Sequence, residues 1–166
     1  MPKQHYKAGG FRARDSIGYL VKHAHQLMKD RVEAEFEAQG FTFQQWIVLM
    51  YLRDGIAATP AELCREARHD SGAMTRLIDQ LEDRALIERQ RDSKDRRVVQ
   101  LKLTPSGHEM VESLIPLVVG CLNQALDDFS REEVALFKNL LQRLIGRMRE
   151  LNSASSAAPS SERREP

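Results

Sequence analysis

Five cationic side chains gather within residues 89–97, and they suit this segment to bind a polyanion. The segment reads RQRDSKDRR, in which five cations and two acids leave a local net charge of +3. The alternating pattern around it predicts strands at residues 87–91 and 98–103, joined by a polar turn. Arginines at the tip of such a hairpin can enter a narrow minor groove of DNA, where the negative potential is enhanced. An isolated run of this kind is more often only a solvated loop, so its interpretation depends on the residues before it.

Those preceding residues, 70–85, are typical of a helix that reads base edges. Asp70 or Ser71 can cap it, and apolar side chains from Met74 to Ala85 define one face. Small or polar residues at its N-terminal end would let the backbone approach the major groove. Arg76 can pair with guanine edges or with phosphates.

A shorter helix is expected at residues 59–67, before a break at residues 68–70. Thr59-Pro60-Ala61-Glu62 combines a cap, a proline suited to the first helical position and a carboxylate that completes a capping box. The hydroxyls of Thr59 and Ser71, at two helix N-termini, suit phosphate contacts. The alternative is a pair of ordinary surface helices with good caps.

Together these segments predict a helix-turn-helix followed by a hairpin wing. The residues expected to contact DNA are Thr59, Ser71, Gly72, Ala73, Thr75, Arg76, Gln80, Arg89, Lys94, Arg96 and Arg97.

Long helical patterns at both ends of the chain are expected to position this reader. They cover residues 15–40 and 104–151, whereas the helix-turn-helix and wing occupy about 42–103, with a capping box at Thr42 and Gln45. The apolar stripes of 104–151 are wider than one core contact requires, which favours a dimer interface. The alternative is a larger monomeric core. The fold class expected is therefore mainly α with a small β-hairpin wing.

Composition limits the remaining function classes. The chain has 166 residues, 30% of them charged, and a net charge of +1, so any DNA-binding surface must come from local asymmetry. No glycine-rich phosphate loop, Gly-x-Ser-x-Gly or His-Glu-x-x-His motif is present, so an enzyme is not expected. His23 and His25 lie about 200° apart around a helix, so no metal site is expected.

The two cysteines, Cys64 and Cys121, make no disulfide framework. With no apolar leader and no membrane-length apolar run, they favour a cytoplasmic protein with reduced thiols. Residues 1–14 are expected to form a flexible basic arm, either solvated or in contact with DNA. Residues 152–166 are expected to be disordered.

The sequence resembles the MarR family of winged-helix transcription regulators over about residues 15–151. The resemblance is carried by SGAMTRLIDQLE at 71–82, LIER at 86–89, Asp92-x-x-Asp95-Arg96-Arg97, and Leu103-Thr104-Pro105-x-Gly107. It implies a homodimer whose terminal helices interlock, with residues 70–85 in the major groove and the wing in the minor groove. It also implies that Arg97 is the wing-tip contact and that Asp95 braces the wing through a salt bridge, while Arg96 can take a phosphate.

The resemblance further implies a ligand switch, in which a small aromatic carboxylate or phenol binds between the dimer helices and the reader and releases DNA. No other cofactor is expected. Candidate lining residues are Arg14 (or Arg12), Tyr19, His23, Trp46, Met50, Met110 and Leu114, although the buried ones can equally be core.

The interpretation is thus a homodimeric repressor of an inverted-repeat operator in double-stranded DNA, with no membrane association. The alternatives are a non-specific architectural DNA-binding protein, or a MarR-like regulator that responds to oxidation or has no ligand.

Overall fold

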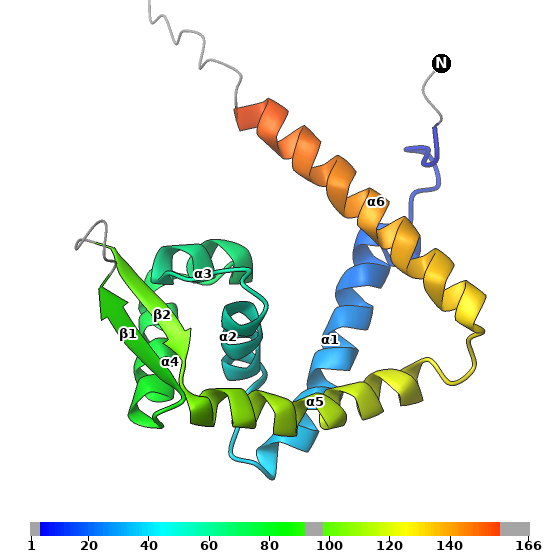
Figure 1. Ribbon diagram of the computed structural model, residues 1–166. Coiled ribbons are helices and arrows are strands. Elements are labelled where there is room, and N and C mark those ends of the chain that lie inside the picture. The colour runs from blue at the N-terminus through cyan, green and yellow to red at the C-terminus, as the bar shows by residue number, and fades with distance from the viewer. Residues whose placement is uncertain (1–3, 92–97, 157–166) are drawn as a thin grey trace, which may run out of the picture. The chain divides into compact units, whose positions relative to one another are not determined.

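The computed structural model describes residues 4–91 and 98–156, and the chain divides into two compact units, one up to Gln124 and one from Ala125 onward (Figure 1). The described elements are a short 3-10 turn at Ala13–Asp15, α1 (Ile17–Glu37), α2 (Phe43–Arg53), α3 (Pro60–Ala67), α4 (Ser71–Asp83), β1 (Ile87–Arg91), β2 (Val99–Leu103), α5 (Pro105–Ala125) and α6 (Arg131–Ser156). The predicted mainly helical fold with one hairpin is confirmed.

Reciprocal side-chain caps determine where α2 and α3 begin. The Thr42 hydroxyl accepts the backbone N–H of Gln45 at 3.2 Å, and the Gln45 side chain accepts the N–H of Thr42 at 3.1 Å. Thr59 and Glu62 repeat the arrangement at 3.2 and 3.0 Å. Each box satisfies N–H groups that a helix leaves unpaired at its start. Both boxes expected from the sequence are confirmed.

The two strands pair antiparallel, with Ile87 opposite Leu103. Ile87 and Leu101 are buried, so one face of the hairpin lies on the core. The N–H of Leu101 also donates to the carbonyl oxygen of Ala58 at 2.8 Å, which joins the loop before α3 to the hairpin. The base of the wing is therefore fixed to the helix-turn-helix.

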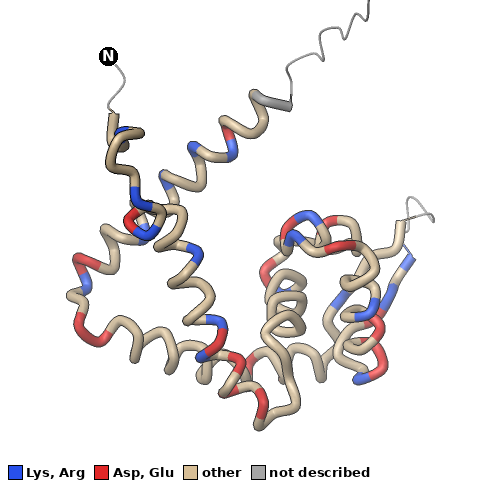
Figure 2. Tube along the Cα trace, turned by 180° about the vertical axis from the view of Figure 1, so that it is seen from behind, with Lys and Arg blue, Asp and Glu red and all other residues tan. Residues whose placement is uncertain are grey.

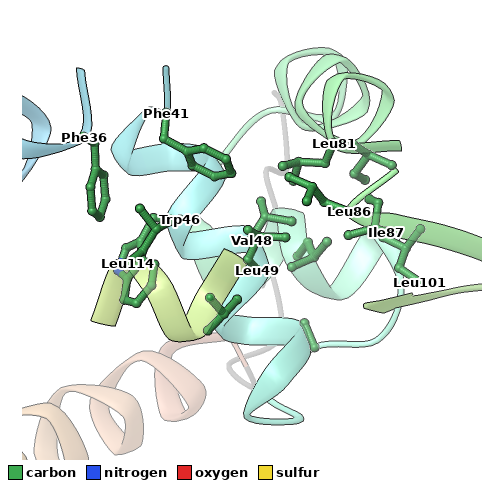
Figure 3. Close-up of a cluster of buried hydrophobic side chains, with 14 of the residues drawn as sticks. Phe36, Phe41, Trp46, Val48, Leu49, Leu81, Leu86, Ile87, Leu101 and Leu114 are labelled. Carbon is green, nitrogen blue, oxygen red and sulfur yellow. The ribbon is translucent and has the colours of Figure 1, made fainter. Parts of the chain in front are cut away.

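The core of the first unit joins residues from α1, α2, α3, α4, the hairpin and α5 (Figure 3). Its fully buried side chains are Phe36, Val48, Leu49, Leu63, Met74, Ile78, Leu81, Ile87, Val111 and Leu114. Because protein interiors are close-packed, this cluster determines which face of α4 remains outward.

α5 begins in close contact with the end of α4. The Thr104 hydroxyl donates to the carbonyl oxygen of Ala85 at 2.7 Å, and Thr104 also accepts the N–H of Gly107 at 3.0 Å. A Cβ at Gly107 would lie 2.0 Å from the carbonyl oxygen of Leu86. The helix then continues through Pro116 to Ala125.

The two ends depart from the sequence-based expectation. Residues 1–14 were expected to form a flexible arm, but Tyr6 folds back, and its hydroxyl oxygen accepts the N–H of Ile17 at 3.0 Å. The Tyr6 and Phe11 rings also lie 5.9 Å apart, so aromatic contacts hold a segment that its charge pattern suggested was free.

In the second unit, α6 continues to Ser156, although a tail was expected from residue 152. Ser153 donates to the carbonyl oxygen of Arg149 at 3.0 Å, a local bond that accompanies the extra turn. A capping box at Ser130 and Glu133 opens this helix. No helix in the described part of the chain is both long and apolar enough to cross a membrane.

Candidate nucleic-acid interface

α4 is held at its N-terminus by Asp70 and along one face by the core. The Asp70 carboxylate accepts the N–H of Ala73 at 2.8 Å, so Asp70 is the cap and Ser71 is the first helical residue. Met74, Ile78 and Leu81 are buried. The exposed side carries Ser71, Gly72, Thr75, Arg76 and Asp79. The small and polar residues predicted to approach DNA therefore lie outward, apart from Ala73, which is half-buried.

The connection from α3 to α4 is tight. Arg68 ends α3 in the left-handed region, with φ of +53°, and the N–H of His69 donates to the carbonyl oxygen of Cys64 at 3.1 Å. A left-handed residue commonly closes a helix, but it is seldom arginine. This turn sets the direction in which α4 leaves α3.

The polar side chains of α4 differ in how far bonds within the protein leave them available to contact DNA. Thr75 donates its hydroxyl proton to the carbonyl oxygen of Ser71 at 2.8 Å, which leaves its oxygen only an acceptor role. Gln80 accepts a 3.2 Å bond from buried Gln45, so part of its amide is committed to α2. Arg76 forms no salt bridge with any described residue and is exposed. Arg76 is thus the residue of this helix best placed to reach bases or phosphates.

Arg89 bridges the hairpin and α4. Its guanidinium lies 2.5 Å from a carboxylate oxygen of Asp79 and also pairs with Glu82. The sequence predicted a DNA contact for Arg89, but the structure places its charge against two acids of the protein. Asp79 and Glu82 are three residues apart on the helix, which puts them within reach of one guanidinium.

The tip of the wing was predicted to carry Lys94, Arg96 and Arg97 with Asp95 as a brace, and these four lie outside the described residues. Over the described part, cationic and acidic residues are interspersed on α3, α4 and the hairpin (Figure 2). A DNA-binding surface here depends on individual side chains more than on a continuous cationic face.

Both short helices of the reader carry an ionised acid at their N-terminus. The N–H of Ala58, with the hydroxyl and N–H of Thr59, lowers the pKa of Glu62. The N–H of Ala73 lowers the pKa of Asp70. These acids neutralise part of the positive ends of the helix dipoles, which weakens the expected attraction of phosphates to those ends.

The side chains predicted to line a ligand pocket are not brought to one place. Trp46 and Leu114 belong to the core, where the Trp46 ring lies 5.7 Å from Phe36. Met50 and Met110 pack against the same cluster. Tyr19 and His23 instead stack on each other, with ring centroids 5.6 Å apart, in the first turns of α1. His23 precedes Phe36 by thirteen residues, or about 20 Å along the helix. Arg14 is exposed in the 3-10 turn.

A groove of about 340 Å³ lies elsewhere, between α1, α2 and the end of α3. It is lined by His25, Gln26, Lys29, Phe43, Gln44, Ile47, Tyr51, Glu66, Ala67, Arg68 and His69. The sequence reasoning missed it. The one local sign of this groove in the sequence was the four-residue spacing of His25 and Lys29, which places both on one face of a helix.

No group of three or more histidine, cysteine or acidic residues that could hold a metal occurs in the part of the chain that the structure describes. Cys121 is buried, with its sulfur 4.0 Å from the carbonyl oxygen of Arg31, and Cys64 is half-buried.

Comparison with known proteins agrees with this arrangement. A sequence profile of the MarR family matches residues 39–98. The multiple antibiotic resistance protein MarR of Escherichia coli is 33% identical over 131 residues, which cover 78% of this chain and 90% of that protein. The chain belongs to the MarR family. It is therefore a DNA-binding transcription regulator and not an enzyme.

Two further similarities concern a repressor and a structure with operator DNA. The transcriptional repressor MprA of Escherichia coli is 28% identical over 131 residues, covering 78% of this MarR-family chain and 74% of MprA. The structure of a mutant MarR from E. coli complexed with operator DNA matches with a TM-score of 0.68 at 28% identity, covering 77% of this chain and 92% of that one.

Proposed function

We propose that this MarR-family regulator is a homodimeric repressor that binds an inverted-repeat operator through α4 and the wing. A small aromatic carboxylate or phenol would release it. The family membership supports the repressor assignment, since its relatives include MprA and the mutant MarR solved with operator DNA.

One observation carries the proposal: the outward N-terminal half of α4. Its buried face fixes the helix, while Gly72 is exposed and brings no side chain to the surface, and Arg76 lies exposed without a protein carboxylate partner among the described residues. A recognition helix needs this combination, because base edges are reached by side chains and by a closely approaching backbone.

Exposed apolar side chains support a dimer. α1 exposes Ile17, Leu20, Val21, Leu27 and Met28, and α6 exposes Leu136, Phe137, Leu140, Leu144, Ile145, Met148 and Leu151. Large apolar surfaces of this kind mark protein–protein contacts in soluble proteins. Two copies would cover both helices and present two α4 helices to one face of DNA.

The wing and the ligand rest on the family resemblance. Arg97 at the wing tip is proposed to enter the minor groove, with Asp95 as its brace. A solved structure of a Mycobacterium tuberculosis MarR family protein is a complex with p-aminosalicylic acid; at 22% identity that protein shares the fold. An effector for the present chain is our proposal.

Footprinting on the DNA flanking its own gene tests this function. We expect two symmetric protections whose centres lie about one helical turn, 10 base pairs, apart. Sedimentation should give twice the 19.0 kDa mass of one chain. A monomer at micromolar concentration, or a single protected half-site, would contradict the proposal. Arg97→Ala should weaken protection while leaving the sedimenting mass unchanged.

A further inference from the structure

We propose that Gln45, a buried residue of α2, orients the side-chain amide of Gln80 so that α4 presents two N–H donors to a keto group of one operator base. Gln45 is then a positioning residue, and Gln80 is a residue that determines specificity. The inference deepens the proposed function and rests on it, because it requires that α4 lie in the major groove.

Gln45 is the one buried residue with a polar or charged side chain in the part of the chain that the structure describes, and it is only 7% exposed. Its amide oxygen completes the cap of α2 by accepting the N–H of Thr42 at 3.1 Å. The capping boxes that open α3 and α6 instead use the carboxylates of Glu62 and Glu133. A box requires only an acceptor at this position, so the amide of Gln45 supplies a donor that the cap does not use.

That donor is bonded to α4. The Nε2 atom of Gln45 donates a hydrogen bond to the Oε1 atom of Gln80 at 3.2 Å. A buried amide N–H without a partner is destabilising, so the folded state is more stable when Gln80 stays in this place.

The two hydrogen bonds of Gln45 determine which way both amides face. A backbone N–H only donates, so the Gln45 atom beside Thr42 must be its oxygen, and its nitrogen must face Gln80. A side-chain amide nitrogen also only donates, so Gln80 must turn its own oxygen toward Gln45. The nitrogen of Gln80, with two N–H groups, has no hydrogen-bond partner among the described residues.

Gln80 lies one helical turn after Arg76, and both are exposed. In the major groove, guanine and thymine present the keto oxygens O6 and O4, whereas cytosine and adenine present amino groups at N4 and N6. An amide that keeps its nitrogen outward therefore favours a keto base at the position it reaches. A freely rotating glutamine would distinguish the two kinds of base less well, because it can present either atom.

Selection of binding sites by the full chain from a library of random duplexes tests this arrangement. We expect one position in each half-site at which guanine or thymine is favoured about fivefold, which is the effect of about one hydrogen bond. Gln80→Ala should remove the preference at that position and leave the other positions unchanged. This variant therefore identifies the base that Gln80 contacts.

Gln45→Glu should invert the preference. The carboxylate still caps α2, as glutamate does in the other two boxes, but it only accepts hydrogen bonds. Gln80 must then turn its nitrogen toward residue 45 and its oxygen outward, so cytosine or adenine should replace guanine or thymine at the identified position. The matched control is Gln44→Glu, which adds the same charge at the neighbouring residue of α2 and should leave the preferred base unchanged.

NMR measurement of side-chain amide exchange checks the orientation without DNA. The NH2 group of Gln80 should exchange with water more slowly in Gln45→Glu than in the wild type, because it becomes a bonded donor in the variant. Equal exchange in the two proteins would overturn the orienting bond.

The selection experiment separates this inference from the proposed function. The inference is overturned if Gln45→Glu leaves the preferred base unchanged, or if Gln80→Ala weakens binding to all sequences alike, as loss of a phosphate contact would. In either case a wild type that still selects an inverted repeat would leave the proposed function standing. A wild type that selects no sequence would contradict the proposed function and this inference with it.

Discussion

Arg89 can be tested for two different roles: direct contact with DNA, or positioning of the α4 residues that contact DNA. Its guanidinium pairs with Asp79 and Glu82, and the three side chains are 35%, 52% and 36% exposed. Pairs this exposed contribute about 0.2–1 kcal/mol each to stability. We therefore expect Arg89→Gln to lower the free energy of unfolding by about 1 kcal/mol, or about 2–4 °C in Tm.

The same substitution should weaken operator binding indirectly. It removes one positive charge from a cluster whose net charge is −1, and this costs about 0.5 kcal/mol per protomer if a phosphate lies about 8 Å away in water. For the two protomers of a dimer the sum is about 1 kcal/mol, which is about a fivefold loss of affinity. The triple variant Arg89→Gln, Asp79→Asn, Glu82→Gln should recover it, because all three charges are then gone.

Fluorescence anisotropy across a salt series separates this account from a direct contact. Loss of a phosphate contact lowers the slope of log K against log salt by about 0.9 per protomer, whereas loss of a brace should leave the slope nearly unchanged. Arg91→Gln is the matched control for the loss of a strand arginine that holds no acid of α4. Arg91 lies on the same strand as Arg89 but has no ion pair to any described residue. If Arg89→Gln lowered the salt slope and the triple variant did not recover operator affinity, the interpretation of Arg89 as a brace of α4 would be refuted.

Three other variants test separate parts of the account. Arg76→Ala should cost about 1–3 kcal/mol of operator binding and relax preference at one base position, and uniform weakening across sequences would instead mark a phosphate contact. The Ala73 N–H lowers the pKa of Asp70, so ionised Asp70 stabilises the folded state fully above its usual pKa of 3.8. This stabilisation is lost as the pH falls through the lower pKa of Asp70 in the folded state. In acid, the free energy of unfolding should therefore depend less on pH in Asp70→Asn than in the wild type. Gly107→Ala should destabilise by about 2–3 kcal/mol in thermal melts, because its Cβ meets the Leu86 carbonyl, whereas Gly120→Ala, with open space around it, should be neutral or stabilising.

Local signals in the sequence predicted the parts of the fold that local chemistry controls. Thr42 with Gln45 and Thr59 with Glu62 act within one helical turn, so their spacing alone identifies a cap. The change to a period of two after Leu86 located β1 at the residues where the structure has it. Family resemblance then supplied the arrangement of these elements around DNA.

Contacts between distant residues were not predictable in this way. Nothing near Gln80 in the sequence indicates that Gln45, thirty-five positions earlier, holds its amide. Arg89 looked like a wing cation because its two acids belong to the preceding helix, and their geometry depends on how the hairpin packs. The groove forms only where α1, α2 and the end of α3 meet, so nothing in the sequence indicates that Lys29 and Arg68 line the same groove.

The central claim is that α4 reads sequence, and a paired affinity measurement tests it most directly. Operator duplex and a scrambled duplex of the same length and composition should be titrated with the full chain at one salt concentration. We expect the operator to bind at least about a thousandfold more tightly than the scrambled duplex. Affinities within about tenfold of each other would contradict it and would favour a non-specific architectural protein.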